Sequence, residues 1–119
     1  MNQLSPIPSD VAELARRRGL AAARRTRETE RTLLIRKLAR VERQADQSRG
    51  WIAQREADVW TSPEMRRMVD WVKAELVRLE EFLDPLKLSQ LLQTRNLFPA
   101  VDDLVDPLGE PPPRHPWGR

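Results

Sequence analysis

Arginine dominates one stretch of this sequence and is the residue type with the clearest chemical potential. Between Arg16 and Arg43 there are eleven basic residues against three acids, Glu28, Glu30 and Glu42. The guanidinium group is always charged, and its planar fork of donors matches the oxygens of phosphate. A segment with such an excess of positive charge requires counter-ions, acids of the same chain or a polyanionic partner. It is therefore the first candidate for a binding site.

Five of these arginines share one side of the expected helix. The stretch has no proline and is rich in Ala, Arg, Leu and Glu, which favour helix formation. At 100° per residue, five side chains fall within about 60° of one another. We call them the arginine row: Arg18, Arg25, Arg36, Arg40 and Arg43. We expect the row to bind backbone phosphates of DNA or RNA, and to read no bases because Asn and Gln are absent between residues 10 and 43.

Two other interpretations of the basic helix remain open. In the first, it is a solvated surface, and Glu28, Glu30 and Glu42 take up part of its charge through pairs three or four residues apart. In the second, it binds an anionic membrane surface, although the stretch from Arg16 to Arg31 offers little apolar surface to insert.

The sequence contains few residues that could carry out catalysis. The single histidine, His115, lies in a proline-rich segment, and the chain has no cysteine, no Gly-rich phosphate loop and no cluster of carboxylates. We therefore expect no enzymatic activity, no cofactor and no metal site. The absence of cysteine and of a secretion signal favours a cytoplasmic protein. The longest strongly apolar run, residues 33–35, is far too short for a membrane span.

The elements that must position these residues are helices. Thr61, Ser62 and Pro63, and then Asp84 with Pro85, are typical helix starts, because the side-chain oxygen caps the helix and proline fits its first turn. The sequence predicts an all-α fold, with an antiparallel helical hairpin and a short third helix. The expected segments are an extended leader at 1–9, a helical domain at 10–98 with helices at 10–60, 63–83 and 85–95, and a disordered acidic and proline-rich tail at 99–119.

Apolar residues mark one face on each of the two longer helices. On the first helix a seam with seven-residue spacing contains Leu34, Leu38, Val41, Ala45, Ile52 and Val59. Upstream the same positions hold Arg24, Arg27 and Arg31, so we expect the residues before about 32 to bury no face. On the second helix the face contains Met65, Met68, Val69, Val72, Leu76, Leu79 and Leu83, with Trp71 and Phe82 on its flank.

One hairpin leaves part of each apolar stripe uncovered. Small cores of this kind are usually completed by a second chain, so we predict a homodimeric bundle with the second helix as its protein interface. A monomeric three-helix bundle is the alternative, because the connections are short.

The tail is a second candidate site. Val101, Leu104, Val105 and Leu108 have helical spacing, with three aspartates between them and a run of prolines after them. An acidic-apolar segment followed by polyproline is suited to docking into a protein partner, or it forms a solubilising end of the chain. A further hypothesis is that the aspartates fold back onto the arginine row and lower its binding to polyanions.

These patterns together favour a small helical accessory protein that binds nucleic acid through its basic helix. The alternative is a protein–protein adaptor that uses the apolar face from Met65 to Leu83 together with the tail.

Overall fold

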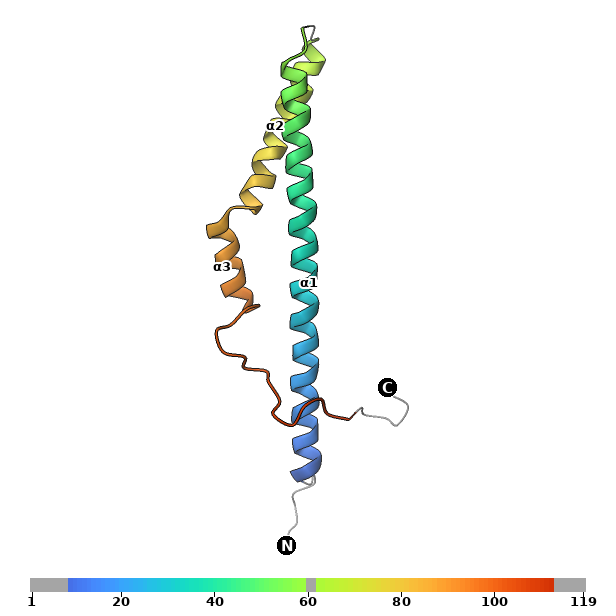
Figure 1. The fold of residues 1–119 in the computed structure, drawn as a ribbon, viewed down its shortest axis with the longest axis vertical. Helices are drawn as coiled ribbons and strands as arrows, with labels where there is room; N and C mark the ends of the chain where they lie inside the picture. The colour runs from blue at the N-terminus through green and yellow to red at the C-terminus, as the bar shows by residue number, and fades with distance from the viewer. Residues whose placement is uncertain (1–8, 60–61, 113–119) are drawn as a thin grey trace. The chain divides into compact units, whose positions relative to one another are not determined.

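The computed structural model describes residues 9–59 and 62–112, and the expectations for residues 1–8, 60–61 and 113–119 lie outside this part. The described residues form three helices, α1 (Ser9–Glu56), α2 (Pro63–Phe82) and α3 (Pro85–Arg95), and they contain no strand (Figure 1). The predicted all-α fold class is confirmed at this level.

The expected start signals of α2 and α3 make the capping contacts that define them. Ser62 Oγ accepts a hydrogen bond from the Met65 N–H at 3.1 Å, and Asp84 Oδ2 accepts one from the Lys87 N–H at 3.4 Å. A proline follows each cap, where the missing N–H costs nothing. Local side-chain chemistry therefore fixes where both helices begin.

Helix α1 runs through Gly50 without a break and ends at Glu56, four residues earlier than predicted. Asp58 follows this end, where its carboxylate would be repelled by the negative pole of the helix, and it pairs with Arg55 at 2.9 Å instead. Val59 is therefore outside the helix and fully exposed, so its predicted place in the apolar seam is wrong.

The chain divides into two compact units, and α1 contributes to both. The described part of the first unit contains residues 9–31 of α1 and residues 99–112. The second unit, residues 32–98, contains the rest of α1 with α2 and α3.

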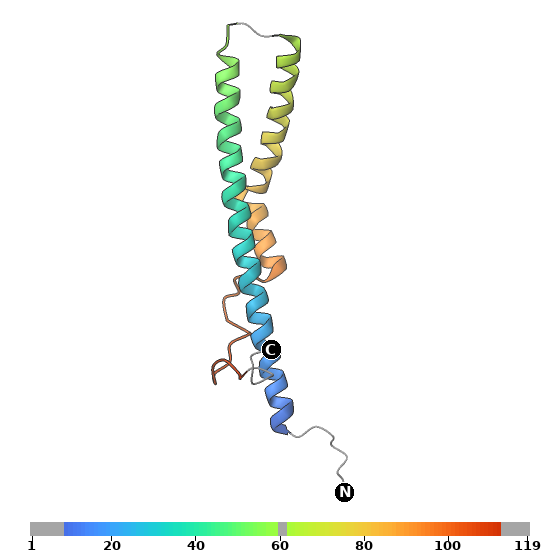
Figure 2. The same ribbon diagram turned by 90° about the vertical axis from the view of Figure 1, so that its right-hand side faces the viewer.

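Within the second unit, α2 runs antiparallel to its part of α1 (Figures 1 and 2). Lys73 Nζ lies 2.6 Å from Glu56 Oε1, and Glu80 Oε2 lies 2.9 Å from Arg49 Nη1. Because the residue number rises along α2 as its partner's number falls along α1, these two ion pairs have the order that an antiparallel hairpin requires.

The apolar seam of α1 forms most of the buried surface of this unit. Leu34, Val41, Ala45 and Ile52 are buried as predicted, whereas on α2 only Val69 is buried. All the other apolar side chains of α2 are half-buried or exposed. The core of the second unit is therefore thin, which limits the hydrophobic contribution to its stability.

Helix α3 ends in a left-handed turn that anchors the chain. Asn96 has φ 50°, and the Leu97 N–H donates to the Leu92 carbonyl at 3.2 Å while the Asn96 N–H donates to the Gln93 carbonyl at 3.1 Å. This is the pattern of a Schellman motif, in which the residue after the turn makes an apolar contact with the last turn of the helix. Leu97 occupies that place and is 1% exposed.

Truncating this anchor tests whether the second unit depends on it. We expect Leu97→Ala to lower the free energy of unfolding by about 2–5 kcal/mol, because it leaves a cavity where a leucine was enclosed. Leu86→Ala is the matched control: Leu86 is exposed, and its truncation should change stability by less than about 0.5 kcal/mol. Urea unfolding followed by circular dichroism measures both, and equal effects would contradict this assignment of the core.

Candidate functional site

In the first unit, the acidic segment 99–112 lies against arginines of α1 and makes the most extensive set of polar contacts in the described chain. Between residues 16 and 31 the helix carries seven arginines and two glutamates, and the acidic segment carries four acids and no base. Acids of this chain therefore neutralise most of the local excess of positive charge.

Arg17 and Asp106 form the most enclosed contact. Arg17 Nε donates to Asp106 Oδ2 at 2.7 Å, and the two side chains are 14% and 2% exposed. Asp106 Oδ1 accepts from the Leu108 N–H at 3.0 Å, so both carboxylate oxygens are engaged. Arg17 Nη2 also donates to the Gly109 carbonyl at 3.2 Å. The guanidinium fork thus binds a side chain and the backbone of one turn together.

That turn depends on glycine. The Gly109 N–H donates to the Asp106 carbonyl at 3.0 Å, and Gly109 has φ 82°, a conformation that residues with a Cβ rarely adopt. The turn aims the Gly109 carbonyl at Arg17. Arg17 is therefore bound both by the charged Asp106 carboxylate and by a backbone carbonyl that the turn positions.

Arg27 binds the other end of the segment. Its Nη2 donates to Asp103 Oδ1 at 2.7 Å, its Nη1 lies 3.7 Å from Asp102 Oδ1, and its side chain is 13% exposed. Asp102 Oδ1 also accepts from the Leu104 N–H at 2.9 Å, and the Leu104 carbonyl accepts from Arg24 Nη1 at 2.6 Å. Asp102 and Asp106 thus begin similar turns, each of which presents acceptors to α1.

Glu110 completes the contact near the end of the described segment. Its two carboxylate oxygens lie 3.3 Å from Arg24 Nη2 and from Arg25 Nη1. Arg18 Nε donates to the Pro112 carbonyl at 3.1 Å. These contacts bring the acidic segment to two members of the arginine row.

Hydrogen bonds from the arginines lower the pKa of two acids in this contact. The hydrogen bond from Arg17 is the main cause of the lowered pKa of Asp106, and that from Arg27 is the main cause of the lowered pKa of Asp103. Partial desolvation opposes both shifts. The charged forms of both carboxyls therefore favour the bound segment.

The arginine row divides between the two units. Arg18 and Arg25 belong to the first unit and contact the acidic segment. Arg36, Arg40 and Arg43 belong to the second unit, are exposed, and form no ion pair with any other described residue. The expected pairing within the helix is seen at Glu28, which lies 3.3 Å from Arg31.

The sequence did not predict that the acidic segment would bind mainly Arg17, Arg24 and Arg27. Arg17, Arg24 and Arg27 fall within about 80° on the helix, outside the arginine row. Upstream of residue 32 we expected no buried face, and this is wrong: Ala21 is 2% exposed, and Arg17 and Arg27 are largely covered. Spacing alone does not identify this contact, because Arg17, Arg24 and Arg27 are separated by seven and three residues, whereas Asp103, Asp106 and Glu110 are separated by three and four.

Most of the predicted interface residues on α2 are buried or half-buried within the second unit. Their exposure divides them: Val69 is buried, Met65, Val72, Leu76, Leu79, Phe82 and Leu83 are half-buried, and Met68 and Trp71 are exposed. Phe82 lies under the Lys37 ammonium at 4.5 Å from the ring centroid. The surface that α2 leaves free is therefore its flank at Met68 and Trp71.

The predicted docking residues of the tail are mostly exposed. Val101, Val105 and Leu108 are exposed and Leu104 is half-buried. Residues 99–112 contain turns but no helix or strand, and the predicted disorder of the tail is not confirmed there. The polyproline end and His115 lie outside the described residues.

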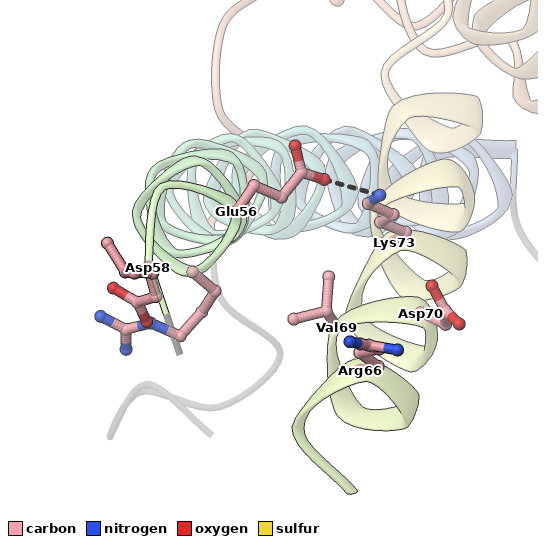
Figure 3. A pocket seen from close by; sticks show the side chains of 8 residues that line it. Glu56, Asp58, Arg66, Val69, Asp70 and Lys73 are labelled. Atoms are coloured by element: carbon pink, nitrogen blue, oxygen red, sulfur yellow. Dashed lines mark hydrogen bonds and ion pairs between the residues drawn. The ribbon is translucent and has the colours of Figure 1, made fainter. Parts of the chain in front are cut away.

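A hollow of about 550 Å³ lies between the end of α1 and the start of α2. Figure 3 shows Lys73 reaching Glu56 across it, and Asp58, Arg66, Val69 and Asp70 also line it. The hydrogen bond to Glu56 raises the pKa of Lys73 and favours its protonated form. The lining therefore contains an ion pair that joins the two helices.

Comparisons with known proteins give no family assignment for this chain. Neither the protein-family models, the curated proteins nor the solved structures give a match to this chain. The described residues contain no group of three or more acidic or His side chains that could hold a metal ion. Among them no helix is both long enough and apolar enough to cross a membrane.

Acid should release the acidic segment from α1. Asp103 and Asp106 have a lowered pKa when bound, so their contribution is complete above the ordinary aspartate pKa of about 4 and is lost as pH falls through the lowered value. We expect the distance between dyes on residues 22 and 108 to increase below about pH 4, measured by energy transfer. Asp106→Asn should leave a longer distance already at pH 7, and an unchanged distance in that variant would contradict the contact.

Proposed function

We propose that this protein is a non-enzymatic helical accessory protein that binds the phosphate backbone of nucleic acid through Arg36, Arg40 and Arg43. The observation that carries the proposal is the exposure of these three arginines on one face of α1 with no ion pair to another described residue. Neighbours three and four residues apart on a helix can contact successive phosphates along one strand or across a groove. Because Asn and Gln are absent between residues 10 and 43, we propose that the binding is largely independent of sequence.

Salt dependence tests the proposed phosphate contacts. On duplex DNA each neutralised phosphate contributes about −0.9 to the slope of log affinity against log salt, so three contacts give a slope of about −2.7. We expect the triple variant Arg36→Ala, Arg40→Ala, Arg43→Ala to lose most of this slope and at least about tenfold in affinity, while its helical content is unchanged because the side chains are exposed. Fluorescence anisotropy with duplex DNA and single-stranded RNA between roughly 50 and 300 mM salt measures both quantities.

A matched control separates a site from net charge. Arg66, Lys87 and Arg95 are exposed residues of the same unit, and changing all three to alanine removes the same charge from α2 and α3. This control should retain the affinity and slope of the unmodified protein to within about one contact. Equal losses in the two triple variants would show that binding follows total charge and would overturn the assignment to α1.

The acidic segment 99–112 is proposed to compete with nucleic acid for the arginines of the first unit. Its carboxylates occupy the donors of Arg17, Arg25 and Arg27 that a phosphate would use. Replacement of this internal ligand would require a polyanion at higher local charge or a protein that binds the tail. The segment therefore limits non-specific binding in this proposal.

Removing the competitor should strengthen binding. We expect deletion of residues 100–119 to tighten duplex DNA binding by about tenfold and to steepen the salt slope, because arginine contacts become available. The isosteric variant Asp102→Asn, Asp103→Asn, Asp106→Asn, Glu110→Gln keeps the chain length and should reproduce most of the effect. An unchanged affinity in both proteins would contradict competition by the tail.

The alternative function is a protein–protein adaptor. It is favoured by the exposure of Met68 and Trp71 on α2 and of Val101, Val105 and Leu108 in the tail. Apolar contacts of this kind persist in salt, whereas the contacts of Arg36, Arg40 and Arg43 weaken. We also propose that the chain forms a homodimer, because the thin core of its second unit leaves apolar side chains of α2 exposed to solvent.

A further inference from the structure

The side of α2 that does not face α1 carries charges arranged symmetrically about its centre. Each acid on one side of the centre has a base at the same separation on the other side. This outer face consists of Glu64, Arg67, Met68, Trp71, Glu75 and Arg78, which lie within about 100° on the helix. All are exposed except Glu75, which is half-buried. Trp71 at the centre is 65% exposed, an unusual state for a large aromatic side chain outside an interface.

Two ion pairs flank the tryptophan. Arg67 Nη2 lies 3.4 Å from Glu64 Oε1, and Arg78 Nη1 lies 2.9 Å from Glu75 Oε1. The order along the helix is therefore acid, base, Trp71, acid, base. Glu64 and Arg78 are each seven residues from Trp71, and Arg67 and Glu75 are each four residues from it.

This symmetry has a direct consequence for two antiparallel copies. If a twofold axis passes through Trp71, each residue lies at the same height along the helix axes as the residue of its partner at the same separation on the other side of Trp71. Glu64 then lies level with Arg78 of the second copy, and Arg67 lies level with Glu75. At 1.5 Å per residue these pairs lie about 10 Å and about 6 Å from the axis. Each ion pair occurs twice, so the contact contains four complementary pairs.

The apolar residues of the outer face fit the same register. In this arrangement Trp71 lies against its own copy at the axis, and Met68 lies next to it on the same face. Aromatic anchors surrounded by a charged rim are the usual arrangement of an energetically dominant centre in an interface. A parallel arrangement would instead place each charged residue beside an identical one.

We infer that the outer face of α2 is the contact surface of a homodimer, formed by antiparallel packing of two copies about Trp71. The inference does not rest on nucleic-acid binding, and it gives a contact surface to the dimer proposed above. The contact covers about four turns of helix, which is at the small end of specific interfaces, so the dimer is weak and depends on protein concentration in the micromolar range. The surface is separate from Arg36, Arg40 and Arg43, which belong to α1.

Exchanging charges within one ion pair tests the register without changing net charge. The variant Glu75→Arg, Arg78→Glu keeps an acid and a base three residues apart on α2 but places like charges opposite each other in the dimer. We expect its dimer dissociation constant to rise at least tenfold in sedimentation equilibrium of the full chain without nucleic acid, at about 10 to 500 µM. Circular dichroism checks that helical content is retained. Trp71→Ala should raise the dissociation constant by a similar factor.

A second exchange restores complementarity and distinguishes this interface from a general loss of stability. The variant Glu64→Arg, Arg67→Glu should also be monomeric by itself. Mixing the two exchanged proteins places opposite charges together at all four positions, so the mixture should form a heterodimer about as tightly as the unmodified chain forms its dimer. The control Glu13→Arg, Arg16→Glu reverses an exposed pair on α1, 2.6 Å apart, and should leave the dimer unchanged.

Three results would overturn the inference. The first is an unmodified chain that remains monomeric at about 500 µM, which would also end the homodimer proposal without bearing on nucleic-acid binding. The second is a dimer that tolerates the Glu75→Arg, Arg78→Glu exchange, which would place the contact elsewhere. The third is a mixture of exchanged variants that stays monomeric, which would exclude the antiparallel register about Trp71.

Discussion

The structure depends on one constraint. The inward side of the single 48-residue helix α1 changes from basic to apolar along its length, so its two parts need neighbours of different chemistry. From Leu34 onward this side is apolar, and in the second unit α2 lies beside it with an apolar face of its own. Before residue 32 it carries arginines, and in the first unit their neighbour is an acidic segment that brings carboxylates and carbonyl groups. Each half is thus matched by a segment of its own chemistry, because apolar surface and guanidinium groups cannot satisfy each other.

The same division explains why the arginines of α1 differ in what they can do. Arg17 and Arg27 are largely covered, and their donors are used by aspartates whose charged form the contact stabilises. Arg36, Arg40 and Arg43 have no such neighbour among the described residues and remain exposed. A guanidinium group that is already paired must lose its partner before it binds a phosphate, whereas an exposed one exchanges only solvent and counter-ions. The proposed binding site is therefore the second group, and the donors of the first group are occupied by the acidic segment.

Charge patterning on α2 acts at a different level. Ion pairs three residues apart on an exposed helix contribute little to the stability of one chain. Their order about Trp71 matters more, because a second copy can use it to select one orientation and one register. Charged residues that hardly stabilise the monomer can in this way determine how two chains meet, and in the inferred dimer the exposed Trp71 is the apolar centre of the contact.

The sequence by itself determined the fold class, the starts of α2 and α3, and the burial of Leu34, Val41, Ala45 and Ile52. These features depend on local capping chemistry and on helical periodicity, which a single sequence displays directly. Only the tertiary structure decided that α1 ends at Glu56, and that the acidic segment binds Arg17, Arg24 and Arg27. Contacts between residues more than 70 positions apart depend on turns such as that at Gly109 and on competition among many arginines for few acids. Neither can be read from the spacing of charges along the chain.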